Sequence, residues 1–438
     1  MNHALISEIF GQLDALPIVD IHTHVQFNQP NACNIGDILS YHYYTELYNS
    51  AEFQDGALPL GDPEALTRVL FKGLRLIKNT VQYDWLMAIG RDFLGLEASD
   101  WQPECWRKVF DRSCEVMGRA EWVGELLEQA NIVRVYLTNS YDDDLSGLNR
   151  SLYTPCLRVE PFLNGIEQAA ERERMSAYLG QPIEVPCDVI AALDIALDSF
   201  SEYSLGYVAA SLAPNVRTWQ VAAEDAERLM RRLIEGGSWS DDDRAAWQAY
   251  TMGRIAEACR ARNLPFHLMV GVDRAAYAQA VPSGSDLPDS ISSLRGYDWL
   301  FNSFPEVRFP LAVLTDTTGL ELASAGWIRH NVYPSGHWWY ANQPSEIARE
   351  LRRRLDVVPG GKLIGYFSDA YYLEFILPKF RMYKFELATV LAERVERSLL
   401  HPNSNPFTLD DALELGNMLL VDNPLSIVGT AESALNIA

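Results

Sequence analysis

Two histidines separated by one residue stand at the end of an apolar, β-branched stretch of the chain. The stretch 17–25 reads Pro-Ile-Val-Asp-Ile-His-Thr-His-Val and is predicted to form a strand. Because side chains alternate along a strand, we expect His22 and His24 to point to the same face. Two imidazoles at the carboxyl end of a strand can hold a divalent metal ion. The rival interpretation is a pair of structural histidines at the start of a loop.

Further ligands are expected at the ends of other strands. Asp369 closes one strand-like run and could bind the ion or act as a base; its rival role is a helix N-cap. His267 lies in another run, where the rival interpretation is a hydrogen-bonded core histidine. The segment 209–212 offers neither Lys nor His, which favours one ion over two. We predict one divalent ion, zinc by its imidazole and carboxylate ligands, held by His22, His24, Asp369 and His267.

The elements that must position these residues alternate between short apolar runs and helical patterns. Helices are predicted over 222–236, 241–262 and 344–355, between some of the runs. This alternation is typical of βαβ units and a parallel sheet, so an α/β fold is expected. Eight strands predict a (β/α)8 TIM-like barrel, with a doubly wound sheet as the rival. The predicted strands are 17–25, 131–140, 153–162, 204–213, 264–271, 307–315, 326–334 and 361–369.

The spacing of the strands is uneven in one place. Residues 34–130 fall between the first two predicted strands, have a helical pattern and are rich in Trp and Tyr. We interpret them as a helical insertion over the active-site mouth. The whole chain, 1–438, is then a single barrel domain with this insertion.

The net charge of the chain indicates which classes of binding partner fit it poorly. With 36 Lys and Arg against 59 Asp and Glu, the net charge is −23, which argues against nucleic acid and anionic membrane surfaces as partners. An anionic small substrate is compatible with this charge if a few arginines gather in one cleft. We find neither a signal peptide nor a membrane span. The six cysteines are scattered, as expected for reduced thiols in a cytoplasmic protein.

Several segments resemble the uronate isomerase family of the amidohydrolase superfamily. Residues 335–343, Ser-Gly-His-Trp-Trp-Tyr-Ala-Asn-Gln, are similar to the family's G-x-W-W-F-N-D segment, and 362–369 to its F-V-G-M-L-T-D strand. The residues 41–43, Tyr-His-Tyr, stand where the family carries D-H-Y on its lid-like insertion. Residues 156–158 resemble its T-F-R, and 271–274 its G-A-x-R. The match is collinear over nearly the whole chain.

The resemblance implies an aldose–ketose isomerase that interconverts a hexuronate, of the glucuronate or galacturonate type, and its keto form at a mononuclear metal site. The expected partner is a small sugar acid, and a homo-oligomer is left open. The candidate proton carriers are Asp369, His42 and Tyr43, and the candidate substrate-binding residues are Arg158, Arg274, Trp338 and Trp339.

The chain also departs from the family pattern. Ala370-Tyr371 stands where the family has Ser-Arg, residues 44–48 replace its W-R-x-M-R, and 210–212 replace its D-H-G. The lost arginine belongs to the family's substrate site, so a different sugar acid fits the same scaffold. The rival functions are a metal-dependent hydrolase of an amide or lactone, and a protein that binds a sugar acid without converting it.

Overall fold

The computed structural model describes residues 2–51, 58–278, 284–401 and 406–429. Its strands are short and almost all parallel. They are β1 (Ile18–Asp20), β2 (Ile132–Tyr136), β3 (Tyr153–Thr154), β4 (Leu157–Arg158), β5 (Val208–Leu212), β6 (Phe266–Val270), β7 (Val272–Asp273), β8 (Leu287–Pro288), β9 (Phe309–Val313) and β10 (Val332–Pro334).

Helices make up most of the remaining chain. They are α1 (His3–Asp14), α2 (Ile35–Leu39), α3 (His42–Ser50), α4 (Pro63–Gly73), α5 (Val81–Leu94), α6 (Trp106–Met117), α7 (Trp122–Gln129), α8 (Glu160–Leu163), α9 (Ala169–Leu179), α10 (Pro186–Ser201), α11 (Ala223–Ile234), α12 (Asp241–Arg262), α13 (Asp298–Ser303), α14 (Asp316–Ile328), α15 (Pro344–Val357), α16 (Ile376–Leu400), α17 (Leu409–Asn417) and α18 (Asn423–Val428).

The parallel strands form two sheets, which confirms the predicted α/β class. One sheet has the order β1-β2-β3 and the other the order β10-β9-β6-β5-β4, while β7 and β8 form a separate antiparallel pair. Every residue of β6 and β9 is buried. Burial on both faces is typical of parallel strands covered by helices, and it explains why these strands read as continuous apolar runs.

Backbone hydrogen bonds join the sheets at their edges. A parallel bridge pairs Asn139, beyond β2, with Leu157 of β4, and another pairs Ser335, beyond β10, with Ile364. The predicted eighth strand is therefore reduced to one bridge. At its far end, Asp369 N donates to His22 O (3.0 Å) and His24 N donates to Ala370 O (2.7 Å). The last predicted strand thus lies beside the first.

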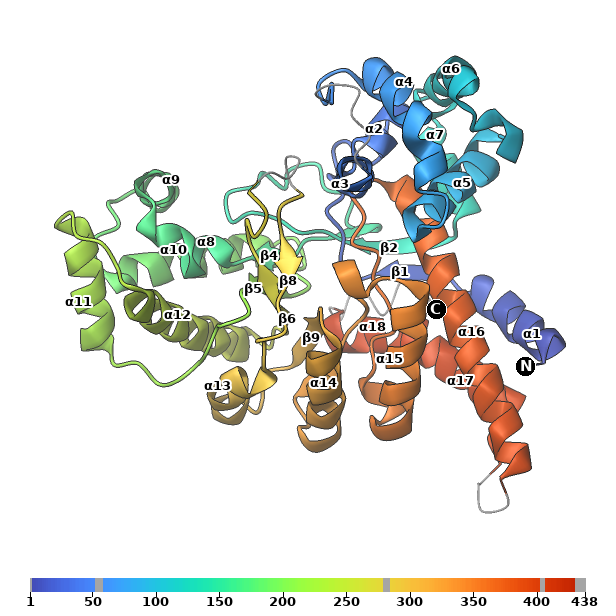
Figure 1. The fold of residues 1–438 in the computed structure, drawn as a ribbon. Helices are drawn as coiled ribbons and strands as arrows, with labels where there is room; N and C mark the ends of the chain where they lie inside the picture. The colour runs from blue at the N-terminus through green and yellow to red at the C-terminus, as the bar shows by residue number, and fades with distance from the viewer. Residues whose placement is uncertain (1, 52–57, 279–283, 402–405, 430–438) are drawn as a thin grey trace.

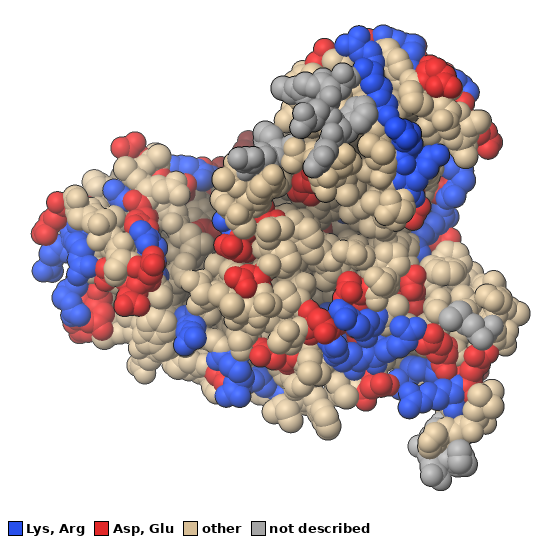
Figure 2. Space-filling view, in the orientation of Figure 1, with Lys and Arg blue, Asp and Glu red and all other residues tan. Residues whose placement is uncertain are grey.

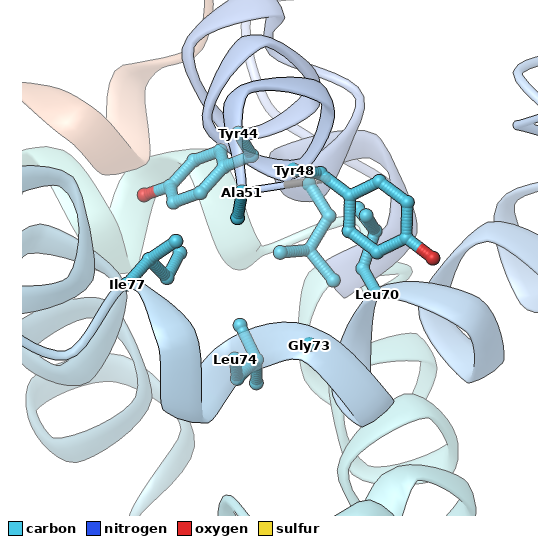
Figure 3. Close-up of a pocket in the computed structure, with 8 residues that line it drawn as sticks. Tyr44, Tyr48, Ala51, Leu70, Gly73, Leu74 and Ile77 are labelled. Carbon is cyan, nitrogen blue, oxygen red and sulfur yellow. The ribbon is translucent and has the colours of Figure 1, made fainter. Parts of the chain in front are cut away.

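The helices surround the strands in separate groups (Figure 1). Helices α2 to α7 gather in a lobe above β1 and β2, α8 to α12 lie on the opposite side, and α14, α15 and α16 stand side by side below. Residues 52–57 of the predicted insertion lie outside the described residues. Within the lobe a small apolar cavity of about 10 Å³ lies between α3 and α4, with room for about one water molecule (Figure 3).

The predicted helices at 222–236, 241–262 and 344–355 are confirmed as α11, α12 and α15. Several predicted strands are longer than the observed ones, and the first observed strand ends at Asp20, before His22 and His24. Two predicted strands also include helical residues. Residues 160–162 belong to α8, where Pro161 occupies the first turn and cannot donate to a sheet. Residues 326–328 end α14, because a short apolar run in a helix cannot be told from a strand by periodicity.

The face drawn in Figure 2 carries both kinds of charge. Basic side chains form a band on the upper lobe and a group below it, with acidic side chains beside them. Among the described residues, no helix combines the length and the apolar character needed to cross a membrane.

Candidate metal centre

His22, His24 and Asp369 come together where the first and last apolar runs meet. One ligand atom of each residue lies within 4.8 Å of the other two. The two imidazole rings are 5.4 Å apart and nearly perpendicular. Both histidines lie just beyond β1, which ends at Asp20, and both face the same carboxylate. Nε2 of His24 lies 3.2 Å from Asp369 Oδ1, and Nε2 of His22 lies 3.5 Å from the same oxygen.

The donor set fits a divalent cation. Asp369 Oδ1 is buried and has no hydrogen-bond partner among the described residues, although both Nε2 atoms point toward it. An orphaned buried carboxylate oxygen is costly unless a positive group satisfies it. Burial also lowers the pKa of His22 well below its ordinary value, so this imidazole is neutral and can act as a ligand. Two imidazoles and a carboxylate form a set that zinc accepts.

The backbone holds Asp369 in an unusual conformation. Its φ is +55°, in the left-handed region that Asp tolerates better than most residues. The backbone amide of Asp369 donates to the carbonyl of His22, and the carbonyl of Asp369 accepts from the Tyr41 hydroxyl at 3.1 Å. Burial raises the pKa of the Asp369 carboxyl, but the contact with the His24 imidazole and the charge of the Lys379 ammonium lower it by more, so the net pKa is below its ordinary value. The carboxylate is therefore ionised at neutral pH.

Two buried ionisable residues form hydrogen bonds to Ser368, the residue before Asp369. Lys379 of α16 donates to the carbonyl of Ser368 at 2.9 Å and lies 4.6 Å from the ring centroid of Trp85. Asp20 of β1 accepts hydrogen bonds from the amide (2.9 Å) and the hydroxyl of Ser368. Burial raises the pKa of Asp20 to about 7 and lowers that of Lys379 to about 8. Both groups anchor the residue that precedes the carboxylate ligand.

A cavity of about 290 Å³ opens onto the three candidate ligands. Every predicted site residue except Tyr43 and His267 lines this cavity. The predicted residues that line it are His22, His24, His42, Arg158, Arg274, Trp338, Trp339 and Asp369, and they are joined by Glu160, Ser211, Met269, Asp286 and Tyr371.

His42 is presented to the cavity from the first turn of α3. Its Nδ1 lies 2.7 Å from Oε1 of Glu46, one turn further along the helix, which leaves Nε2 for another partner. Tyr43 is buried beside it but lines a neighbouring cavity. Burial, followed by the charge of Asp369, raises the pKa of Tyr43 well above its ordinary value, so its hydroxyl keeps its proton.

The two arginines at the cavity are already paired with acids. Nη2 of Arg158 lies 3.4 Å from Oε1 of Glu160, and Nη1 of Arg274 lies 2.5 Å from Oδ2 of Asp286. Arg274 also donates to the Ser211 hydroxyl at 2.8 Å. A guanidinium carries five N–H donors, so each arginine keeps donors for a second anion.

His267 lies behind the candidate ligands in β6. Its ring centroid is 5.7 Å from that of His22, and it falls outside the group of three ligand atoms that lie together. Burial lowers the pKa of His267 to about 3, and neither ring nitrogen has a hydrogen-bond partner among the described residues. Its place in the metal site therefore stays a prediction.

Solved structures with the same architecture exist. A uronate isomerase from Thermotoga maritima matches with a TM-score of 0.87 at 18% identity, over 97% of each chain. A glucuronate isomerase from Caulobacter crescentus matches with a TM-score of 0.85 at 17% identity, over 97% of this chain and 94% of that one. A uronate isomerase from Bacillus halodurans matches with a TM-score of 0.78 at 20% identity, over 100% of this chain and 99% of that one. The chain has the uronate isomerase fold.

Other comparisons add less. A Lactobacillus casei protein classed provisionally as a metal-dependent hydrolase has a TM-score of 0.61 to this chain at 14% identity. No protein-family model matches the sequence, and no curated protein matches it either. The uronate isomerase fold is therefore established by structure alone, at identities too low to carry the reaction with it.

Several residues around the site of this uronate isomerase fold were missed in the sequence. Glu160 and Asp286 pair with the arginines, and Tyr207 and Thr138 contact the two metal-site histidines. Thr138 and Glu160 stand near the carboxyl ends of predicted strands, where functional side chains gather in barrels. This position could have marked both residues as candidates. Nothing comparable in the sequence marks Asp286 or Tyr207.

Proposed function

We propose that this protein is a metal-dependent aldose–ketose isomerase acting on a hexuronate or a related sugar acid. The observation that carries the proposal is that one cavity is lined both by His22, His24 and Asp369 and by Arg158 and Arg274. A hexuronate carries the two matching groups, a carbonyl with its neighbouring hydroxyl for the metal site and a carboxylate for the arginines. The uronate isomerase fold agrees with this assignment.

His22, His24 and Asp369 would hold one divalent ion, zinc by the chemistry of its ligands. When bound, the ion supplies Lewis acidity that polarises the carbonyl oxygen of the open-chain sugar. Since Asp369 has a lowered pKa, it is better suited to be a ligand than a base.

His42 is the residue we propose as the proton carrier. Glu46 accepts the Nδ1 hydrogen of His42, which leaves the basic Nε2 free to take the proton from C2 and return it to C1 through an enediol. Tyr43 keeps its proton and would act as a hydrogen-bond donor from the adjoining cavity.

The arginines would bind the carboxylate of the substrate. Arg158 and Arg274 provide charge-assisted donors, and their acidic partners Glu160 and Asp286 hold the guanidinium groups in place. Trp338 and Trp339 line the same cavity and would pack against the sugar. Tyr371 stands where the family has an arginine, so Arg158 and Arg274 would carry the charge recognition among the described residues that line the cavity.

We also propose the closed form of the fold. The hydrogen bonds from 369–370 to 22–24, together with the bridge between Ser335 and Ile364, are those that a closed (β/α)8 barrel requires. The helices of residues 34–130 would be an insertion in this single domain that covers the mouth, since His42 reaches the cavity from α3.

A hydrolase of an amide or lactone is the second candidate. The likeness to the Lactobacillus casei protein favours it, and an ionised Asp369 beside the ion is compatible with activation of a water molecule.

Product analysis with the zinc-loaded protein distinguishes the two. We expect D-glucuronate, D-galacturonate or a neighbouring sugar acid to be converted into its ketol in a zinc-dependent reaction. No ketol from any uronate, combined with metal-dependent cleavage of lactones or N-acyl compounds, would replace the isomerase by the hydrolase.

A further inference from the structure

Two hydroxyl groups contact the metal-site histidines from behind, on the ring nitrogen that faces away from Asp369. Tyr207, which precedes β5, contacts His22, and Thr138, which follows β2, contacts His24. The hydroxyls come from segments far apart in the sequence, yet they make the same pair of contacts.

The Tyr207 contact fixes the hydrogen on His22. The Tyr207 hydroxyl donates its one hydrogen to the carbonyl of Ile21 at 2.7 Å. The same oxygen lies 3.0 Å from Nδ1 of His22, so it can only accept there. Nδ1 of His22 therefore carries the hydrogen, and the lone pair is on Nε2, the atom directed at Asp369.

The Thr138 contact repeats this arrangement at His24. The Thr138 hydroxyl donates to the carbonyl of Thr23 at 3.0 Å and lies 2.9 Å from Nδ1 of His24. The hydroxyl again has no hydrogen left for the ring, so Nδ1 of His24 is the donor. In both pairs the hydroxyl is bonded to the carbonyl of the residue that precedes the histidine.

We propose that Tyr207 and Thr138 are positioning residues that hold both histidines in the Nδ1–H tautomer, with each Nε2 lone pair ready to bind the ion. Without these hydroxyls, each imidazole could carry its hydrogen on Nε2, which would prevent that nitrogen from binding the ion. Each ring could also rotate about its Cβ–Cγ bond. The proposal rests on the metal site of the proposed function, and not on the reaction assigned to it. Both neighbours also increase the basicity of the ligand nitrogen.

The structure allows the hydroxyls to be removed without changing the shape of the site. Tyr207 is fully buried and packs edge-on against His267 at 5.3 Å, so Tyr207→Phe keeps the ring contact. Thr138→Val keeps the volume of the side chain, and Thr138→Ser keeps the hydroxyl. The matched control is Tyr297→Phe, because Tyr297 is another buried tyrosine whose hydroxyl has no hydrogen-bond partner among the described residues.

The test is the affinity of the full-length protein for Zn²⁺, measured by competition with a chromophoric chelator. We expect Tyr207→Phe and Thr138→Val each to weaken binding by about 10- to 100-fold, whereas Thr138→Ser and Tyr297→Phe stay within about twofold of the wild type. Wild-type affinity in folded Tyr207→Phe and Thr138→Val variants would overturn the proposal. This readout is independent of turnover, so a protein that binds zinc as expected but forms no ketol contradicts only the reaction.

A second measurement needs no variant that could fail to fold. In metal-free wild-type protein labelled with ¹⁵N-histidine at pH 8, above the usual pKa of imidazole, the nitrogen chemical shifts report which ring atom carries hydrogen. We expect protonated Nδ1 and unprotonated Nε2 for His22 and His24. Protonated Nε2 on both rings would overturn the proposal.

Discussion

Two groups of residues that line the cavity are held in different ways. Among the candidate metal ligands, His22 and Asp369 are buried and His24 is 24% exposed, and backbone hydrogen bonds join the segments that carry them. The side chains of Arg158 and Arg274 are 40% and 53% exposed, and each is paired with an acid. Buried ligands suit a function that tolerates little displacement, whereas exposed arginines can be exchanged with less cost to the fold. In the proposed function, the metal ligands would set the reaction and the arginines would set the choice of sugar acid.

The largest effect is expected from removing the metal ligands. The double variant His22→Ala/His24→Ala should lose zinc binding altogether, because only one of three candidate ligands remains. Elemental analysis of the purified proteins measures this, with the exposed His3→Ala as the control. Full occupancy in the double variant would contradict the ligand assignment, and two tightly held ions in the wild type would contradict the single site.

The proton carrier should come next. His42→Gln is expected to lower kcat by about 100- to 10,000-fold while zinc content and thermal stability stay near those of the wild type. Glu46→Gln should lower kcat less, since it removes only the orienting contact to Nδ1. Tyr43→Phe should have the smallest effect of the three. If His42 merely packs against its neighbours, the variant should lose stability and retain activity in proportion to the folded fraction.

Substitution of the two arginines tests whether they bind the carboxylate of the substrate. Arg158→Met or Arg274→Met should lower kcat/KM for a uronate by about 100-fold, mainly through KM, if each forms a charge-assisted contact to the carboxylate. Zinc affinity should not change in either variant. An unchanged KM in both variants would show that the carboxylate binds elsewhere.

A smaller effect is expected on stability at Glu374, which follows the Asp369 loop and accepts hydrogen bonds from Trp122 of α7 (2.8 Å) and from Ala32 (3.3 Å). Burial raises the pKa of Glu374 from 4.5 to about 7, so between these values the folded protein holds a proton that the unfolded chain has released. The free energy of unfolding should therefore fall as the pH rises through this range, by about 3 kcal/mol from this group.

Glu374→Gln isolates that contribution. Urea unfolding of the wild type and the variant at pH 4.5 and pH 7.5 should show a smaller loss of stability in the variant. Equal losses in the two proteins would mean that Glu374 is ionised in the folded state at no cost.

The parts of the site that follow from local rules could be predicted from sequence. Alternation in an extended segment predicted that His22 and His24 face the same side, and they do, although β1 ends at Asp20. The place of Asp369 was predicted from the end of an apolar run. Helices α11, α12 and α15 were visible in their periodicity. The ends of strands were harder to predict, because residues 161–163 of α8 and the last residues of α14 are apolar.

What could not be predicted depends on contacts between distant segments. The pairing of Arg274 with Asp286 joins a loop to the segment that leads into β8, and the contact of Tyr207 with His22 spans 185 residues. Neither partner is marked by its neighbours in the sequence. The backbone conformation of Asp369 is equally invisible there, since it arises from hydrogen bonds to His22 and Tyr41.

The central claim is that the cavity moves a proton between two carbons of a sugar acid. The most direct test is to run the zinc-loaded enzyme on D-glucuronate or D-galacturonate in D₂O and to examine the product by NMR and mass spectrometry. We predict a ketol that carries deuterium at C1, because the proton taken from C2 exchanges with solvent on His42 before it is returned. No ketol and no C–H label from any sugar acid, with zinc-dependent cleavage of an amide or lactone in its place, would contradict the account.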